Sequence, residues 1–161
     1  MVRARARLAR RQQGLTLIEL MVCITIAMLL AAAATPFALS WSHQSSVRQT
    51  HAQLRQGLSQ LKATALRNPV AARSPDTSAT LVTQAGQLCL HAGLPTELNC
   101  TAALWQSRVP ASVTVAGASS SCVALDSNGL PLAANVGNRA CARQPTFVIS
   151  RGDETSQLIF D

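Results

Sequence analysis

Hydrophobic positions fall into three zones along the chain. Residues 15–34 form an almost unbroken apolar run in which Glu19 is the single charged residue. A bilayer core of about 30 Å is crossed by about 20 helical residues, so this run is long enough to span a membrane. We expect a transmembrane helix over residues 15–40, with Pro36 bending it or loosening one turn.

The second zone, residues 41–68, has apolar residues at alternating steps of four and three, the pattern of an amphipathic helix. Its length favours packing against the protein's own sheet over a coiled coil with partner helices. Gly57 lies off the apolar positions and should weaken the helix, and Asn68-Pro69 should end it. The stripe comprises Val47, His51, Leu54, Leu58, Leu61 and Ala65, beside a basic edge of Arg48, Arg55 and Lys62.

The third zone, residues 69–161, alternates short β-like segments with turn signals and has no long helical pattern. Residues 70–78 are typical of a loop. The turn signals are Ala85-Gly86, Pro110, Ser127-Asn128-Gly129 and residues 151–156. The expected strands are 79–84, 87–91, 104–109, 112–116, 122–126, 130–133, 146–150 and 157–161. A long helix packed on an antiparallel sheet of such strands is an α+β fold.

Positive charge is concentrated before the apolar run. The chain carries 14 Lys and Arg against 7 Asp and Glu, and five arginines precede Gly14, namely Arg3, Arg5, Arg7, Arg10 and Arg11. Without them nine basic residues face seven acids, a net charge of +2. Basic residues before a span hold the N-terminus in the cytoplasm, so the bulk of the chain should lie outside.

A cleaved secretory signal ending at Ala31–Ala34 is the rival interpretation of this segment. The run is longer than a usual signal core, and Glu19 would have no role inside it. A carboxylate in a spanning helix costs about 2.5 kcal/mol or more and should have a partner, unless it is solvated among the cytoplasmic headgroups. Cleavage after Gly14 would give Leu15 a free ammonium four residues from Glu19, on the same helical face.

Residues 14–20, GLTLIEL, preceded by arginines and followed by the apolar run, closely resemble the class III leader of type IV pilins and type II secretion pseudopilins. The resemblance implies a leader over residues 1–14, cut by a prepilin peptidase between Gly14 and Leu15, and N-methylation of Leu15. It also implies that Glu19 faces the N-terminus of an adjacent subunit during filament assembly. Leu15 departs from the family, where Phe is commoner.

The same resemblance implies a pilin-like fold and location. The first half of a long N-terminal helix would cross the bacterial inner membrane once, with a cytoplasmic N-terminus. The helix would continue as an amphipathic extension and pack on a periplasmic antiparallel β-sheet head, residues 69–161. Other pilins or pseudopilins would be partners through their N-terminal helices.

Four of the five cysteines lie in the expected head, at Cys89, Cys100, Cys122 and Cys141. An even number in an exported domain suggests two disulfides, for which three connectivities exist. We expect Cys89–Cys100 and Cys122–Cys141, which join neighbouring loops. A zinc site at Cys89, His91 and Cys100 competes, but it lacks CxxC pairs and an obvious fourth ligand. Cys23, in the apolar run, should be an apolar filler.

No motif for catalysis is visible. His43, His51 and His91 are scattered, and no nucleophile elbow, HExxH, P-loop or dinucleotide fingerprint is present. The acidic residues of the turn-like segments, Asp126, Asp153 and Glu154, should be solvated or cap turns. We therefore expect no enzyme, no cofactor and no metal.

The expected function is structural, as a minor pseudopilin or minor pilin of a type II secretion pseudopilus or a type IV pilus. The order of elements is similar to the GspH/FimT group. The alternative is a DNA-binding minor pilin of the FimT type, acting in DNA uptake through Arg139, Arg143 and Arg151. Gly137 does not adjoin an arginine, so the Gly-Arg-x-Arg motif of that group is not met. A membrane-anchored protein without a filament role is the third hypothesis.

Overall fold

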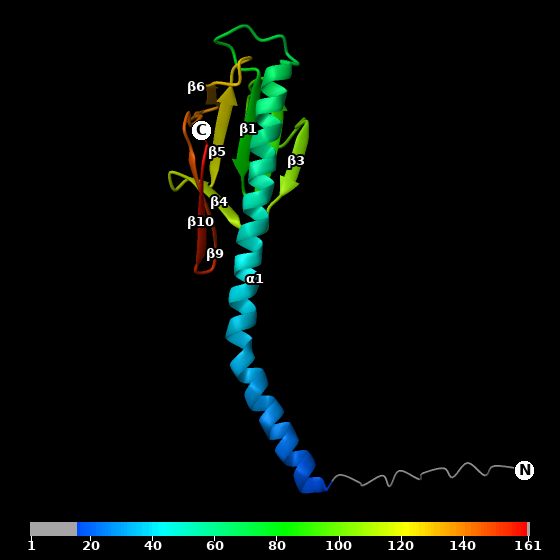
Figure 1. Ribbon diagram of the computed structural model, residues 1–161. Coiled ribbons are helices and arrows are strands. Elements are labelled where there is room, and N and C mark those ends of the chain that lie inside the picture. The colour runs from blue at the N-terminus through cyan, green and yellow to red at the C-terminus, as the bar shows by residue number, and fades with distance from the viewer. Residues whose placement is uncertain (1–15, 161) are drawn as a thin grey trace, which may run out of the picture. The chain divides into compact units, whose positions relative to one another are not determined.

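The computed structural model describes residues 16–160, apart from the side chains of Thr35 and Pro36. The chain divides into two compact units, Met1–Ala38 and Leu39–Asp161. The helix α1, Leu17–Arg67, contributes to both units, and the strands all belong to the second. This is the α+β architecture expected from the sequence, with one long N-terminal helix followed by antiparallel sheets (Figure 1).

The two ends of α1 are fixed by their own polar groups. At its start the hydroxyl of Thr16 accepts the amide of Glu19 at 3.3 Å, a capping interaction. At its end Asn68 adopts a left-handed backbone with φ of 48°, and its amide donates to the carbonyls of Thr64 and Ala65. The helix therefore ends before Pro69 as predicted, and it is one continuous helix across position 36.

In the part of the chain that the structure describes, ten strands follow the helix and form three antiparallel sheets. The first sheet has the order β3-β2-β1-β5-β6, the second β10-β9-β4, and the third β7-β8. The strand bounds are β1 Ala79–Gln84, β2 Gln87–Ala92, β3 Trp105–Arg108, β4 Ser112–Val115, β5 Ser120–Leu125, β6 Pro131–Leu132, β7 Asn135–Val136, β8 Arg139–Ala140, β9 Thr146–Arg151 and β10 Glu154–Ile159.

Turn-forming residues predicted the positions of three hairpins in the head. Ala85 and Gly86 form the tight β1–β2 turn with φ of 42° and 76°, as predicted. The β5–β6 pair around residues 127–129 is also confirmed. The β9–β10 turn is shorter than predicted, because Arg151 pairs directly with Glu154 and β10 starts there rather than at residue 157.

The strand assignment differs from the prediction in two places. β3 and β4 flank Pro110 but belong to different sheets, since β3 pairs with β2 and β4 pairs with β9. The short pair β7–β8 was not predicted, because two-residue strands have no readable alternation. The expected antiparallel sheet is thus divided into three.

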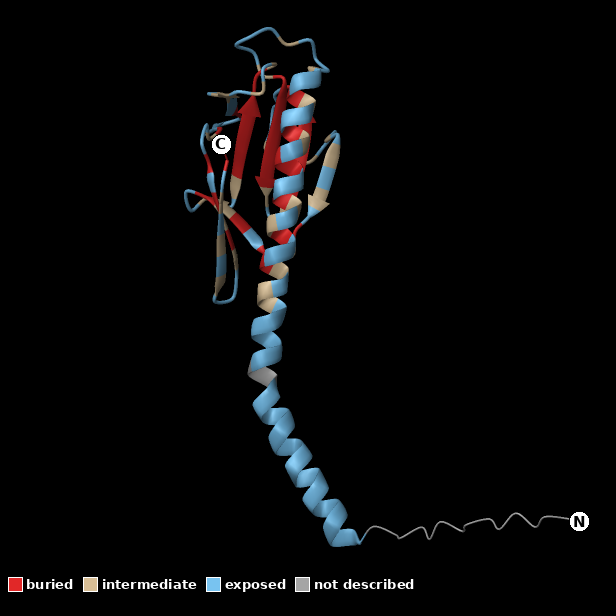
Figure 2. Ribbon diagram, viewed as in Figure 1, coloured by how far each residue is buried: buried red, intermediate tan, exposed pale blue. Residues whose placement is uncertain are grey.

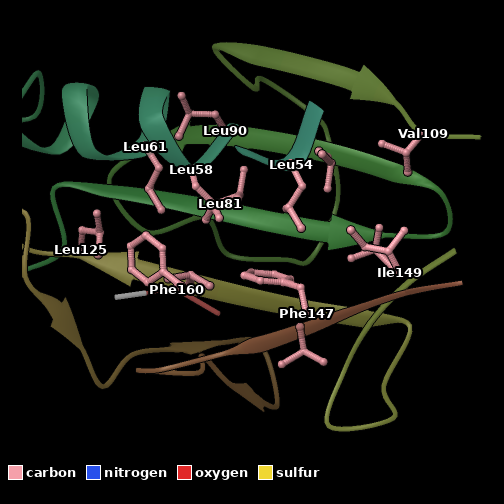
Figure 3. Packing of buried hydrophobic residues seen from close by; sticks show 14 of the residues in the cluster. Leu54, Leu58, Leu61, Leu81, Leu90, Val109, Leu125, Phe147, Ile149 and Phe160 are labelled. Carbon is pink, nitrogen blue, oxygen red and sulfur yellow. The ribbon is translucent and has the colours of Figure 1, made fainter. Parts of the chain in front are cut away.

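The apolar stripe of α1 forms one wall of the main core, as predicted (Figure 3). Leu54, Leu61 and Ala65 are fully buried, and His51 is partly buried. The opposite walls come from both large sheets, through residues such as Leu81 and Phe147. The structure thus favours packing on the protein's own sheets over a coiled coil.

The prediction that Gly57 lies off the stripe is wrong. Gly57 is buried, and a Cβ added there would lie 3.1 Å from Cζ3 of Trp105. Because Gly57 has no side chain, the indole of Trp105, on the edge strand β3, can pack against the helix. The glycine therefore costs helix propensity but makes room for the sheet.

Candidate functional site

Glu19 lies in the first turn of α1 and is exposed. The unpaired amides of a first turn favour a negative charge, so the carboxylate is placed where the helix dipole stabilises it. The proposed cleavage site, Gly14 and Leu15, lies outside the described residues. Cleavage, N-methylation and the assembly role of Glu19 therefore stay predictions.

The apolar half of α1 is exposed at every described position from residue 16 to residue 34 (Figure 2). Leu17 is 78% exposed and Leu29 is 72% exposed. Soluble proteins rarely leave contiguous apolar surface of this size uncovered. Among the described residues α1 is the one helix long and apolar enough to cross a membrane. Such a surface suits lipid or partner helices.

The head contains two disulfides, Cys89–Cys100 and Cys122–Cys141. They belong to a small core cluster with Val82, on the side of the first sheet that α1 does not cover. His91 is buried, and its Nε2 atom lies 2.9 Å from the carbonyl oxygen of Asn99. The residues of the competing zinc hypothesis are therefore engaged otherwise. Cys23 is exposed in the apolar half of α1.

The three arginines of the DNA hypothesis are exposed but are held differently. Arg139 donates to the carbonyl of Ser120 at 3.2 Å, and Arg151 donates to the carbonyl of Pro110. Arg143 lies two residues after Cys141, which is disulfide-bonded to Cys122 of β5. Each guanidinium keeps further donors for a phosphate, so DNA binding stays a prediction.

One of the three acids expected in turns, Asp126, binds backbone amides. Asp126 is buried, and its Oδ1 accepts the amides of Asn128 at 2.9 Å and Leu130 at 2.8 Å. This fixes the β5–β6 turn, as the sequence indicated. Within residues 16–160 no group of three His, Cys, Asp or Glu side chains is placed to hold a metal ion.

Two hollows between α1 and β10 were missed by the sequence analysis. One, of about 340 Å³, is lined by Arg48 and His51 of the helix and by residues 154–156. The other, of about 250 Å³, is lined by Arg55 and Lys62 and by residues 158–160. The basic edge with its seven-residue repeat was visible in the sequence. The strand that lies opposite it was expected only from residue 157, so residues 154–156, which line the first hollow, were assigned to the turn.

Comparison with known proteins gives one match. The family described as "Prokaryotic N-terminal methylation motif" matches residues 9–35, which include Gly14, Leu15 and Glu19. No curated protein and no solved structure matches the chain. The motif supports a pilin- or pseudopilin-type subunit that a prepilin peptidase processes.

Proposed function

We propose that the chain is a minor pseudopilin or minor pilin, a structural subunit of a type II secretion pseudopilus or a type IV pilus. One observation carries the proposal. The segment that matches the methylation motif, residues 9–35, includes the first part of α1, which is exposed at every described position from residue 16 to residue 34. A filament of packed N-terminal helices supplies the cover that this surface lacks.

Processing would prepare that helix for assembly. Cleavage of the leader, residues 1–14, leaves Leu15 with a new α-ammonium, which is then methylated. In an apolar setting this charge needs a counter-ion, and Glu19 of a neighbouring subunit provides it. Charge neutralisation between subunits would set how far one helix is displaced along the next.

The remaining parts of the chain follow from this role. Residues 15–40 would cross the inner membrane once, residues 41–68 would extend the helix, and residues 69–161 would form a periplasmic head. Disulfides persist in oxidising compartments such as the periplasm, so the two bonds of the head support this orientation. The order of helix and short strands is similar to the GspH/FimT group.

The N-terminus of the protein made in its own host tests the processing step. Mass spectrometry should find a chain that starts at methylated Leu15. A chain that still carries Met1, or that starts after the alanines at 31–34, contradicts the proposal.

The assembly step is tested by Glu19→Ala, with Glu19→Asp as the matched control. We expect the alanine variant to insert into the membrane normally but to lose at least tenfold of its recovery with other pilins, because an ammonium is left unpaired. The aspartate variant should retain partial recovery. Equal recovery of Glu19→Ala and the parent protein would favour an anchored protein without a filament role.

DNA uptake is the alternative function, and a gel-shift assay with the full chain in detergent distinguishes it. If the arginines bind phosphates, replacement of Arg139, Arg143 and Arg151 by alanine should weaken binding and flatten its salt dependence by about one unit for each lost contact. Binding that is absent at micromolar protein, or unchanged by the triple replacement, rejects this alternative.

A further inference from the structure

The strand β10 has one open edge. It pairs with β9 alone among the described strands. The amide of Phe160, just beyond β10, donates to the carbonyl of Pro145 on the β9 side. Because hydrogen-bonding groups alternate along an antiparallel strand, the backbone groups of Thr155, Gln157 and Ile159 point away from β9.

This open edge borders the two hollows beside α1. Thr155 lines the first hollow and Ile159 lines the second. Both residues are exposed, so no described part of the head covers them. Unpaired strand edges of this kind accept an added strand from another chain.

Contacts between α1 and the second sheet bound the hollows at both ends. At one end Gly152, with φ of 58°, lies so close to His43 that an added Cβ would collide with the imidazole. At the other end Nζ of Lys62 lies 4.8 Å from the centroid of the Phe160 ring. Between these contacts β10 extends for about 20 Å, which is room for about six extended residues.

The charge of the opposite wall indicates the kind of occupant. Residues 39–67 of α1 contain no Asp or Glu, and Arg48, Arg55 and Lys62 repeat along the wall every seven residues. Glu154 also lines the first hollow and is an acid that an acidic occupant must avoid. Carboxylates spaced along an extended chain would complement the rest of the wall.

We propose that the groove between α1 and β10 binds an extended acidic segment of another protein, which adds to the second sheet as a strand next to β10. The backbone edge supplies hydrogen bonds to the segment, and Arg48 and Arg55 bind its carboxylates. The inference rests on the geometry of the head alone. It holds or fails independently of the proposed role of the N-terminal helix.

The test uses the full chain in detergent micelles and a fluorescent nine-residue peptide of alternating threonine and glutamate, in about 0.1 M salt, where charge pairs are only partly screened. Fluorescence anisotropy should show saturable binding, and the same peptide with lysine in place of glutamate should bind at least tenfold more weakly. Hydrogen exchange of residues 154–160 should slow when the acidic peptide binds. Absence of binding, or exchange that does not change, overturns the proposal.

Two pairs of variants separate strand addition from simple charge attraction. Gln157→Pro removes one outward amide from an edge strand that tolerates proline, and it should weaken binding about tenfold, whereas Gln157→Ala should change it less than about twofold. Arg48→Glu with Arg55→Glu should weaken binding about tenfold or more, whereas Arg73→Glu with Arg143→Glu, an equal change of net charge at exposed sites elsewhere, should not.

A polyanion without strand-forming capacity completes the test. A single-stranded oligothymidine of nine nucleotides should bind more weakly than the acidic peptide and should not slow exchange in β10. An oligonucleotide that binds as tightly as the peptide, or a Gln157→Pro variant that binds as well as Gln157→Ala, would identify a general anion surface and overturn strand addition.

Discussion

The two halves of α1 have the same secondary structure and opposite surroundings. Residues 16–34 are exposed at every position, although nearly all are apolar. Residues 47–65 carry fewer apolar side chains, but Leu54, Leu61 and Ala65 are completely buried. Hydrophobicity therefore does not decide which half forms the core. Periodicity does, because an apolar stripe can be covered by a sheet on one side, whereas a helix that is apolar all round must be enclosed.

The two halves of α1 also differ in the contacts that stabilise them. The second half of α1 is held by contacts within its own chain, which are lost when the head unfolds. The first half makes none of these core contacts among the described residues, so its free energy depends on lipid or on other helices. Substitutions in the two halves should consequently affect different measurements.

The largest expected effect comes from truncating the buried stripe. Leu61→Ala should lower the free energy of unfolding of the head by about 2–5 kcal/mol, because it removes a fully buried side chain and leaves a cavity. Leu29→Ala, in the apolar half, should leave it unchanged within about 0.5 kcal/mol. Denaturant unfolding of the full chain in detergent, followed on the head, measures both. Similar losses for the two variants would contradict the distinction between the halves.

A charge placed in the apolar half should affect membrane insertion and not the head. Ile24→Arg should disfavour insertion by about 2.5–3.5 kcal/mol, which is roughly a hundredfold in the partition between membrane and soluble fractions. Alkaline extraction of membranes provides the measurement, and Leu66→Arg, exposed at the end of the helix, is the matched control. If Ile24→Arg stays in the membrane fraction as fully as the control, this half does not lie in the hydrocarbon core.

The contact of Gly57 with Trp105 should limit the size of the residue at position 57. Gly57→Leu should destabilise the head by about 1–3 kcal/mol, because its side chain has to displace the indole that packs there. In a Trp41→Phe background the fluorescence of Trp105 should change with it. Gly57→Ala should have a smaller effect, since the gain of about 1 kcal/mol in helix propensity offsets the crowding. A stable leucine variant would show that β3 is not fixed against the helix.

A further expected difference concerns two threonines of the same helix. The hydroxyl of Thr50 is buried and accepts the amide of Ala111 at 3.1 Å. Thr50→Val should therefore cost about 1–3 kcal/mol of head stability by leaving that amide unsatisfied. Thr25, whose hydroxyl donates to the carbonyl of Val22 in its own helix, should tolerate valine without loss. Equal costs in thermal unfolding would show that the hydroxyl of Thr50 carries no special role.

The sequence predicted the local features and missed the long-range ones. The stripe of α1, its end at Asn68 and the β1–β2 turn each depend on neighbours within a few residues, and all are confirmed. The separation of β3 from β4 depends on which partner each strand finds across the head, and no period along the chain reports that. The same limit applies to the role of Gly57, because its partner Trp105 is far along the chain.

The candidate site divides in the same way. Glu19 is recognisable by its spacing from Gly14 inside an apolar run, which is a local pattern. The groove between α1 and β10 required both the basic edge and the register of β9 and β10. That register was predicted with a turn that is too long, because Asp153 and Glu154 resemble loop residues although Glu154 begins a strand.

Ser78 connects the helix to the sheet at a point that would carry a pulling force. The hydroxyl of Ser78, the residue before β1, donates to the carbonyl of Ala65. Its amide donates to the carbonyl of Leu125 in β5, and its carbonyl accepts the amide of Gly93, just beyond β2. A single residue thus links the last turn of α1 to three strands at once. A pulling force applied along α1 would be transmitted to β1, the middle strand of the five-stranded sheet. The force would act along the strands, so that many of the hydrogen bonds between them must break together. The head is therefore suited to resist a force that pulls on its helix.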